Sequence, residues 1–201
     1  MEQSIPVSSQ VTQTPRLGAG FGLRAGAQII DLIIHNILGL VVGVFVGLLI
    51  GVYAVATGTP VTTLTTKLQA TAPIDYILAL IGYVLYHAFC EGIHGATLGK
   101  LIFKIHVLKE DGSPVSIGSA FIRSFAFYVD SLFFGIVAAA SMRSSELQQR
   151  LGDKWAKTVV VERSPLNQFQ WPSGWKFVMA FLIAIAADGF MTIISIILKL
   201  L

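Results

Sequence analysis

The apolar residues of this chain fall into four long runs, which predict membrane helices. The runs cover residues 21–55, 74–93, 117–141 and 176–199, and polar segments separate them. A helix needs about 20 apolar residues to cross the hydrocarbon core of a bilayer, so the first, second and last runs are each long enough to span. We therefore expect an all-α membrane protein with about three spanning helices. The run 117–141 is either a re-entrant element or a further span.

The polar segments predict one small β element and a loop. Residues 101–108 are rich in Ile, Val and Phe, and residues 158–161 form a second run of β-branched residues. Such runs, bounded by turn residues, are typical of strands, so the two predict a small cytoplasmic sheet outside the bilayer. Residues 56–72 are rich in Thr and are expected to form a loop.

The ends of the chain predict the domain organisation. Residues 1–20 are rich in Ser, Thr, Gln and Pro and lack a basic start, so we expect a disordered tail rather than a cleaved signal. A membrane domain should follow over residues 21–162. A linker is expected over 163–175, and an additional C-terminal transmembrane helix over 176–201.

Composition supports a membrane protein and excludes several other classes. The chain is 54% hydrophobic and 12% charged, and its mean hydropathy is +0.74, which is too apolar for a soluble domain of this size. The net charge of +3 is too small to indicate nucleic-acid binding. A single cysteine, Cys90, excludes an internal disulfide and an all-cysteine metal site.

The basic residues predict that the run 117–141 returns to the side on which it begins. Residues 95–116 hold three lysines and residues 142–176 hold six Lys or Arg, so both segments look cytoplasmic under the positive-inside rule. The run between them also contains Arg123, Asp130 and Gly135, which a simple span would avoid. We expect a helical hairpin or re-entrant element here, and a cytoplasmic N-terminus.

A polar stripe on the first helix marks a candidate site. Arg24, Gln28, Asp31 and His35 follow one another at steps of four, three and four, which places them on one helical face. An Arg or Asp at the centre of a spanning helix costs about 2.5 to 3.5 kcal/mol, so such residues usually face protein or a water-filled cavity. Arg24 lies near the start of the helix and can reach the membrane surface, whereas Asp31 cannot.

Three further charged positions join this stripe as candidates. Arg123 precedes Asp130 by seven residues, as Arg24 precedes Asp31. This spacing allows each pair to compensate its own charge locally, and the repeated spacing itself reflects either an internal repeat or chance. Asp188 lies near the middle of the last run, with Thr192 and Ser195 on the same face. Asp188 either locks helices together or takes part in transport.

The end of the second run carries a weaker signal for a metal. Its polar groups recur at steps of three and four that suit metal ligation, and they are His87, Cys90, Glu91 and His94. We instead place Glu91 and His94 at the water interface, with His87 bonding between helices, and expect no metal and no cofactor. The following segment 95–100 is too short for a phosphate-binding loop.

A stripe of glycines follows on the first helix. Gly39, Gly43, Gly47 and Gly51 recur at every fourth position. Small residues at this spacing let two helix backbones approach closely in lipid. The stripe predicts a packing face, either for the second helix or for another protomer or membrane partner.

Taken together, these motifs resemble those of the RDD family of bacterial membrane proteins. The resemblance covers residues 17–162 and rests on Arg24 through Asp31, on the Gly-Ala-Thr-Leu-Gly-Lys segment 95–100, on Asp111-Gly112 with Arg123, and on the segment 150–158. The family name records one Arg and two Asp, which the resemblance places at Arg24, Asp31 and Asp153. The chain departs from the common pattern at Gly152, where many members have His, and in its last helix.

The resemblance implies a function that the residues alone do not define. Some members look like cation/proton antiporters, which implies that Asp31 and Asp153 approach Arg24 and that one carboxylate exchanges a proton for a small cation. The alternative is a non-transporting assembly or accessory protein in which this Arg/Asp network is structural. We expect no enzymatic activity, and we expect a multi-pass protein of the cell membrane.

Overall fold

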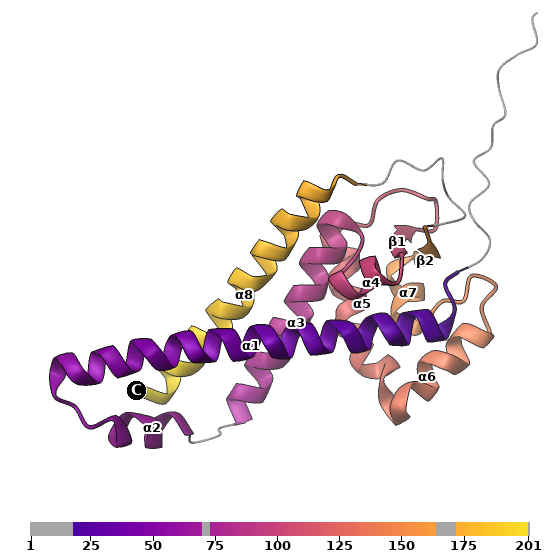
Figure 1. The fold of residues 1–201 in the computed structure, drawn as a ribbon. Coiled ribbons are helices and arrows are strands. Elements are labelled where there is room, and N and C mark those ends of the chain that lie inside the picture. Colours follow the sequence, from indigo (N-terminus) through magenta and orange to yellow (C-terminus); the bar gives the residue numbers. More distant parts are fainter. Residues whose placement is uncertain (1–17, 70–72, 164–171, 201) are drawn as a thin grey trace, which may run out of the picture.

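Three long helices dominate the computed structural model, which describes residues 18–69, 73–163 and 172–200 (Figure 1). They are α1 (Phe21–Thr57), α3 (Pro73–His94) and α8 (Gly174–Leu200), and all three are long and apolar enough to cross a bilayer. Helices α3 and α8 lie side by side along their lengths, and α1 runs obliquely past them. The three predicted spans are confirmed.

The Thr-rich segment after α1 contains a helix, so the predicted loop 56–72 is wrong in part. Helix α1 ends at Thr57 and is capped by Gly58, whose φ of 68° lies in the left-handed region that favours glycine, and α2 (Val61–Gln69) follows. The Thr66 hydroxyl donates to the Thr62 carbonyl oxygen over 2.7 Å. Such bonds to the preceding turn let threonines sit in a helix whose ends pack against neighbours, here α1 and α8.

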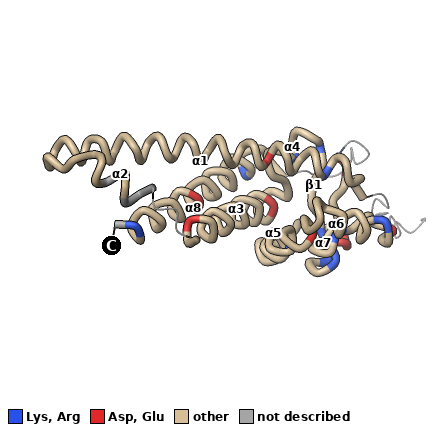
Figure 2. Tube along the Cα trace, turned by 90° about the horizontal axis from the view of Figure 1, so that it is seen from below, with Lys and Arg blue, Asp and Glu red and all other residues tan. Residues whose placement is uncertain are grey.

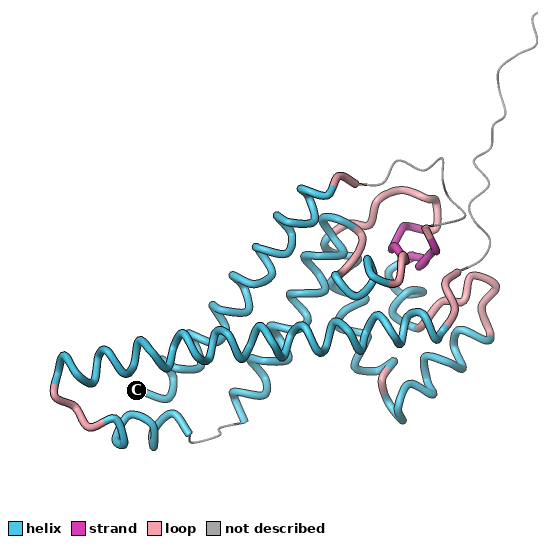
Figure 3. Tube along the Cα trace, viewed as in Figure 1, coloured by secondary structure: helices cyan, strands magenta, loops and turns pink. Residues whose placement is uncertain are grey.

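A compact unit lies at one end of the helices, and we call it the headpiece. It consists of α4 (Leu98–Ile102), β1 (Ile105–Lys109), α7 (Leu151–Ala156) and β2 (Thr158–Glu162). The two strands pair antiparallel with Val107 opposite Val160, and the loops around them gather at the same end (Figure 3). The predicted sheet is confirmed, although its first strand begins later than expected because α4 takes up the start of that segment.

The predicted N-terminal tail ends inside the headpiece. Ala19 is fully buried and its N–H donates to the Val160 carbonyl oxygen over 2.7 Å, while Gly18 pairs with Val161. These residues therefore belong to the folded unit, which corrects the boundary at 20. Residues 1–17 of the expected tail and 164–171 of the expected linker lie outside the described residues.

The apolar run 117–141 forms a sharply bent pair of helices. Helices α5 (Ile117–Asp130) and α6 (Leu132–Arg143) meet at 115°, and Phe133, Phe134 and Gly135 at the bend have positive φ angles. The strands that flank the pair, β1 before it and β2 after it, are hydrogen-bonded to each other. The run therefore begins and ends at the same end of the molecule, and the overall class of helical membrane protein with a small sheet is confirmed.

Charged residues are distributed unevenly over this fold. Figure 2 shows most Lys, Arg, Asp and Glu near the headpiece, α6 and α7, with a few on α3 and α8. Helix α1 carries no Asp, Glu, Lys or Arg after Asp31, so most of its length is suited to lipid. The polar site is therefore concentrated where α1, α3 and α5 meet the headpiece.

Candidate functional site

Asp153 is the centre of a buried ion-pair network that joins three helices. Its carboxylate is fully buried and accepts hydrogen bonds from Arg24 Nη1 of α1 and Arg123 Nη1 of α5. It also accepts the Arg150 backbone N–H over 3.0 Å, which caps α7. Burial alone would raise the pKa of Asp153, but the Arg123, Arg24 and Arg150 guanidinium groups hold that pKa well below its usual range.

The network continues from Arg123 into α3 and α4. Arg123 Nε donates to Glu91 Oε2 over 3.0 Å, and Lys100 Nζ lies 2.7 Å from Glu91 Oε1. Glu91 and His94 are each only 3% exposed, so other parts of the protein cover both side chains, and their position at the membrane–water interface stays a prediction. Helices α4 and α5 cover this end of α3, because Lys100 and Arg123 supply the charges that a buried Glu91 requires.

Asp31 lies apart from Arg24 and holds the start of α4. Its carboxylate accepts hydrogen bonds from Tyr86 Oη at 3.0 Å, Thr97 Oγ1 at 2.6 Å and Gly99 N at 2.8 Å. A side chain at Gly99 would place its Cβ 2.9 Å from Asp31 Cγ, so only glycine permits this approach. The glycine and threonine of the 95–100 segment thus build a docking point for Asp31.

Asp130 has a matching role at α7. It accepts the backbone N–H groups of Leu151 at 3.1 Å and Gly152 at 3.3 Å. The expected local pairs, Arg24 with Asp31 and Arg123 with Asp130, are therefore wrong. Two residues separated by seven positions lie about 10.5 Å from each other along a helix axis. Each side chain therefore contacts partners on other elements instead.

A second polar cluster lies within the spanning helices, away from the Asp153 network. His35 Nε2 of α1 lies 4.0 Å from Asp188 Oδ1 of α8, and both side chains are less than one-fifth exposed. Asp75 of α3 pairs with Lys199 over 2.7 Å and accepts a hydrogen bond from Ser195. These residues line a cavity of about 330 Å³ between the helices.

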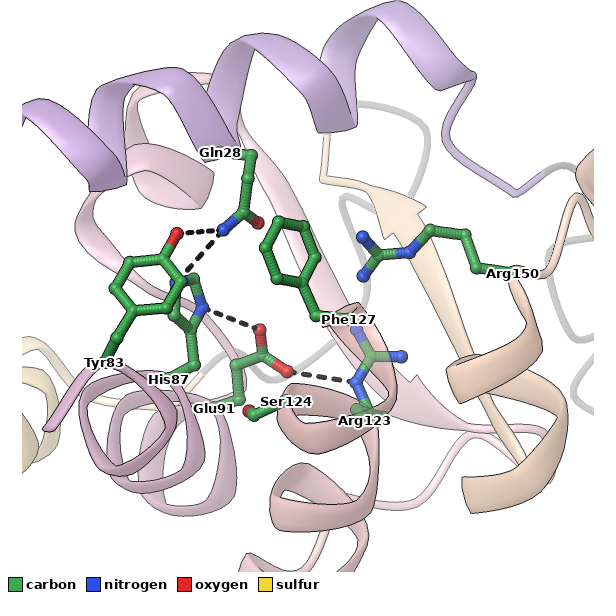
Figure 4. Close-up of a pocket in the computed structure, with 8 residues that line it drawn as sticks. All are labelled: Gln28, Tyr83, His87, Glu91, Arg123, Ser124, Phe127 and Arg150. Carbon is green, nitrogen blue, oxygen red and sulfur yellow. Dashed lines mark hydrogen bonds and ion pairs between the residues drawn. The ribbon is translucent and has the colours of Figure 1, made fainter. Parts of the chain in front are cut away.

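Three side chains connect the two clusters (Figure 4). Gln28 reaches from α1 toward α3, donates to Tyr83 Oη and lies 3.3 Å from His87 Nε2. His87 Nδ1 in turn lies 3.6 Å from Glu91 Oε1, and the Tyr83 ring packs edge-on against His35 at 5.2 Å between ring centroids. Polar contacts thus run along one face of α3.

The candidate metal ligands serve other contacts. Within the described residues, no three His, Cys, Asp or Glu side chains lie close enough together to hold a metal ion. Cys90 is buried beside Tyr86 and Ala184, and the His94 ring packs against His106 and Phe177. These side chains fill the space between α3, α8 and the headpiece.

The glycine stripe of α1 makes no close contact with the described residues, although Gly39 lines the cavity between the helices. A Cβ atom added at any of its positions would meet no described atom within 4 Å, and the positions are Gly39, Gly43, Gly47 and Gly51. The stripe therefore does not pack against the second helix. Lipid or another protein remains to cover it.

Sequence reasoning did not identify three members of the network in their observed roles. Glu91 and Lys100 neutralise each other inside the network, and Arg150 lies beside Asp153 with its Nε 4.0 Å from Oδ2. One sequence signal that could have identified Glu91 is its spacing of four from His87, which puts both residues on one face of the helix. Another was the position of Lys100 at the end of the 95–100 segment.

Comparison with known protein families finds a match to this chain. A family model of the RDD family matches residues 18–157, which contain the Asp153 network, the Asp31 site and most of the headpiece. Searches of curated proteins and of solved structures find no match. Helix α8, with Asp188, lies beyond the matched region. Because the match covers more than half of the chain, the protein belongs to the RDD family.

Proposed function

We propose that this protein is a multi-pass protein of the cell membrane that exchanges protons for small cations, with Asp188 and His35 holding the proton inside the bilayer. Ionisable residues in spanning helices are costly, and they mark ion and proton pathways more often than other positions. The basic segments beside the headpiece favour a cytoplasmic position for that end and for the N-terminus.

The outer half of the proposed route begins at Asp75. Asp75, Ser195 and Lys199 line the same cavity as Asp188 and His35, so water or a small cation entering it reaches both carboxylates. Among the described residues, the ion-pair partner of Asp188 is His35, at 4.0 Å. A carboxylate with so few fixed donors can gain or lose a proton without breaking a network.

The inner half of the route follows α3 toward the headpiece. From His35 the contacts pass through Tyr83 and Gln28 to His87, and then to Glu91. Each side chain along this path can donate or accept a hydrogen bond. The observation that carries the proposal is the His35–Asp188 pair beside a cavity in the middle of the spanning helices.

The alternative is a non-transporting assembly or accessory protein, and the Arg/Asp network favours it. Asp153 and Asp31 are both fully buried, and their oxygens accept several fixed hydrogen bonds. Removing a proton or a partner from such a network is costly, so its members suit a structural role better than a cycling one. In our proposal the network fixes the headpiece, while exchange takes place at Asp188.

Flux through the purified full-length protein in liposomes separates these two functions. A pH-sensitive dye inside the vesicles reports whether adding Na⁺ or K⁺ outside dissipates a preset proton gradient. We expect the wild type to dissipate it, and Asp188→Asn and His35→Gln to slow the rate by at least about tenfold, because neither replacement can cycle a proton. Asp111→Asn, in an exposed turn, is the control and should keep the wild-type rate.

Two results would count against the transport proposal. One is a wild-type rate equal to that of empty liposomes, which would favour the assembly role. The other is an unchanged rate in both the Asp188→Asn and His35→Gln variants, which would exclude this pair as the proton carrier.

A second copy of the chain is our proposed occupant of the glycine stripe. Replacing Gly43 and Gly47 by Leu should remove crosslinked dimers from membranes without changing the unfolding temperature, because no described atom of the same chain lies near either position. The control replaces Val41 and Phe45, on the opposite face, by Leu. Equal crosslinking in both variants would exclude the stripe as the contact.

A further inference from the structure

A cavity between α1 and the bent helices α5 and α6 combines a basic end with apolar walls. Its volume is about 270 Å³. Arg24 and Arg150 line the basic end, and the walls include Phe21, Ile29, Phe134 and Ala138. This cavity is separate from the one beside His35 and Asp188, and the proposed proton route does not use it.

Two arginines that line this cavity and a third, Arg123, in the adjoining ion-pair network each have a buried guanidinium nitrogen without a hydrogen-bond partner among the described residues. They are Arg24 Nη2, Arg123 Nη2 and Arg150 Nε. The Arg24 side chain is only 4% exposed, so water satisfies it poorly. A buried charged donor without an acceptor costs more than one that is paired, which indicates that an acceptor from outside the chain completes the site.

The charges around the cavity favour an anion. Three guanidinium groups, those of Arg24, Arg123 and Arg150, surround the single carboxylate of Asp153. Glu91 contributes a negative charge next to Arg123 but is itself paired with Lys100. Asp130 also lines the cavity, and its two oxygens accept the backbone N–H groups at the start of α7. One positive charge therefore remains in excess.

The Arg150 side chain is the part of this cluster that is best placed to meet a ligand. It lines both this cavity and the small pocket shown in Figure 4, where it extends toward Phe127 and Arg123 also forms part of the lining. No hydrogen bond joins its guanidinium group to another side chain in the described parts of the chain. Its Nε lies 4.0 Å from Asp153 Oδ2, a distance longer than a hydrogen bond.

We infer that this cavity binds the phosphate group of an anionic phospholipid, with Arg150 and Arg24 on the phosphate and an acyl chain along the apolar wall. Guanidinium groups bind phosphate oxygens through paired, charge-assisted hydrogen bonds. Basic pockets between membrane helices are known to bind anionic headgroups. The wall favours a lipid over a free phosphate ion, because Ile29 is 59% exposed and Phe134 is fully exposed, as lipid-facing residues are.

Lipid retention by the purified full-length protein tests this inference. The protein is reconstituted in vesicles of phosphatidylglycerol and phosphatidylcholine in equal amounts, extracted in detergent and gel-filtered, and its bound lipid is measured by mass spectrometry. We expect selective retention of phosphatidylglycerol, which Arg150→Gln lowers by about tenfold through loss of a charge-assisted contact. Arg143→Gln, an exposed arginine outside this cavity, should retain lipid like the wild type.

A second variant keeps the test decisive if Arg150→Gln folds poorly. Ala25→Phe fills part of the cavity while leaving all three arginines in place, and it should also lower phosphatidylglycerol retention. Three results would overturn the inference: equal retention of phosphatidylcholine, which indicates annular lipid only; full displacement by excess inorganic phosphate, which indicates a free-anion site; or unchanged retention in both variants.

Discussion

Asp153 and Asp188 are both aspartates held between helices, yet their surroundings differ in one decisive respect. Asp153 is fully buried and bonded to Arg24, Arg123 and the Arg150 backbone. Asp188 is partly exposed and has His35 at 4.0 Å beside a cavity. The number of fixed donors thus separates a carboxylate that anchors the fold from one whose protonation can change.

The same contrast holds for the regions around the two residues. The headpiece fixes every carboxylate of its network with donors from other elements, so its polar groups serve as joints between α1, α3, α5 and α7. The middle of the spanning helices instead has few polar contacts and an open cavity. We therefore expect a variant that removes a single carboxylate to lose more stability the more hydrogen-bond donors that carboxylate accepts from.

Asp153→Asn is expected to have the largest effect. It leaves the Arg24 and Arg123 guanidinium groups buried without their carboxylate, which for a broken buried pair costs about 3 to 5 kcal/mol. Most of the protein should then fail to fold, as judged by gel filtration in detergent and by the unfolding temperature. The matched control is Glu146→Gln, an exposed residue in the loop before α7. A wild-type unfolding temperature for Asp153→Asn would show that the network is not an anchor.

Asp31→Asn should have a smaller effect on stability and almost none on exchange. The amide keeps the shape of the carboxylate but places an NH₂ group among three donors, which costs about 1 to 3 kcal/mol of unfolding free energy. If exchange takes place at Asp188, flux per folded molecule in liposomes should stay at the wild-type value. Lost flux with intact folding would instead return the proton-carrying role to Asp31.

Acidification should weaken the headpiece through His106. Burial, followed by His94 and Arg163, lowers the pKa of His106 from 6.5 to about 3. A folded pKa below the unfolded one adds stability above pH 6.5 that is lost as the pH falls toward 3. We expect the unfolding temperature to fall between about pH 7 and pH 5, and His106→Gln to reduce that slope. The lowered pKa of Asp153 affects stability only at pH values below the usual pKa range of an aspartate, so it does not contribute to this slope.

If His106→Gln keeps the full wild-type slope over this interval, another group must be responsible for the pH dependence. Comparing the two proteins at the same detergent and salt concentrations isolates the contribution of this histidine, because all other titratable groups are the same in both proteins.

The apolar pattern was sufficient to predict the spanning helices, because length and hydropathy are local properties of each apolar run. The β-branched run 158–161 likewise predicted a strand. The partners of the charged residues were not predictable from spacing, because spacing on a single helix does not show which other element faces it. The approach of Asp153 to Arg24, across 129 positions of sequence, was implied only by the family resemblance. The burial of Glu91 was missed for the same reason, since only the packing of α4 and α5 over α3 covers it.

The docking of Asp31 on α4 was only partly predictable from the sequence. Thr97 and Gly99 sit in a recognisable segment, but its glycines invite comparison with phosphate-binding loops. The structure instead uses Gly99 to let a carboxylate approach the helix start. A small residue before a short helix thus shows that something approaches closely, without showing whether the group is a ligand or a side chain.

Asp188→Asn should have the smallest effect on stability. Its carboxylate loses one ionisable partner at 4.0 Å, a distance longer than a hydrogen bond, so less stabilisation is lost than when the hydrogen-bonded Asp153 network is broken. The backbone carbonyl of Asp188, which accepts the Thr192 hydroxyl at 3.2 Å, is unaffected by the substitution. The unfolding temperature in detergent should therefore stay close to the wild-type value, far above that of Asp153→Asn. A large drop would show that Asp188 is an anchor like Asp153 and would remove the physical basis for assigning it a changing protonation state.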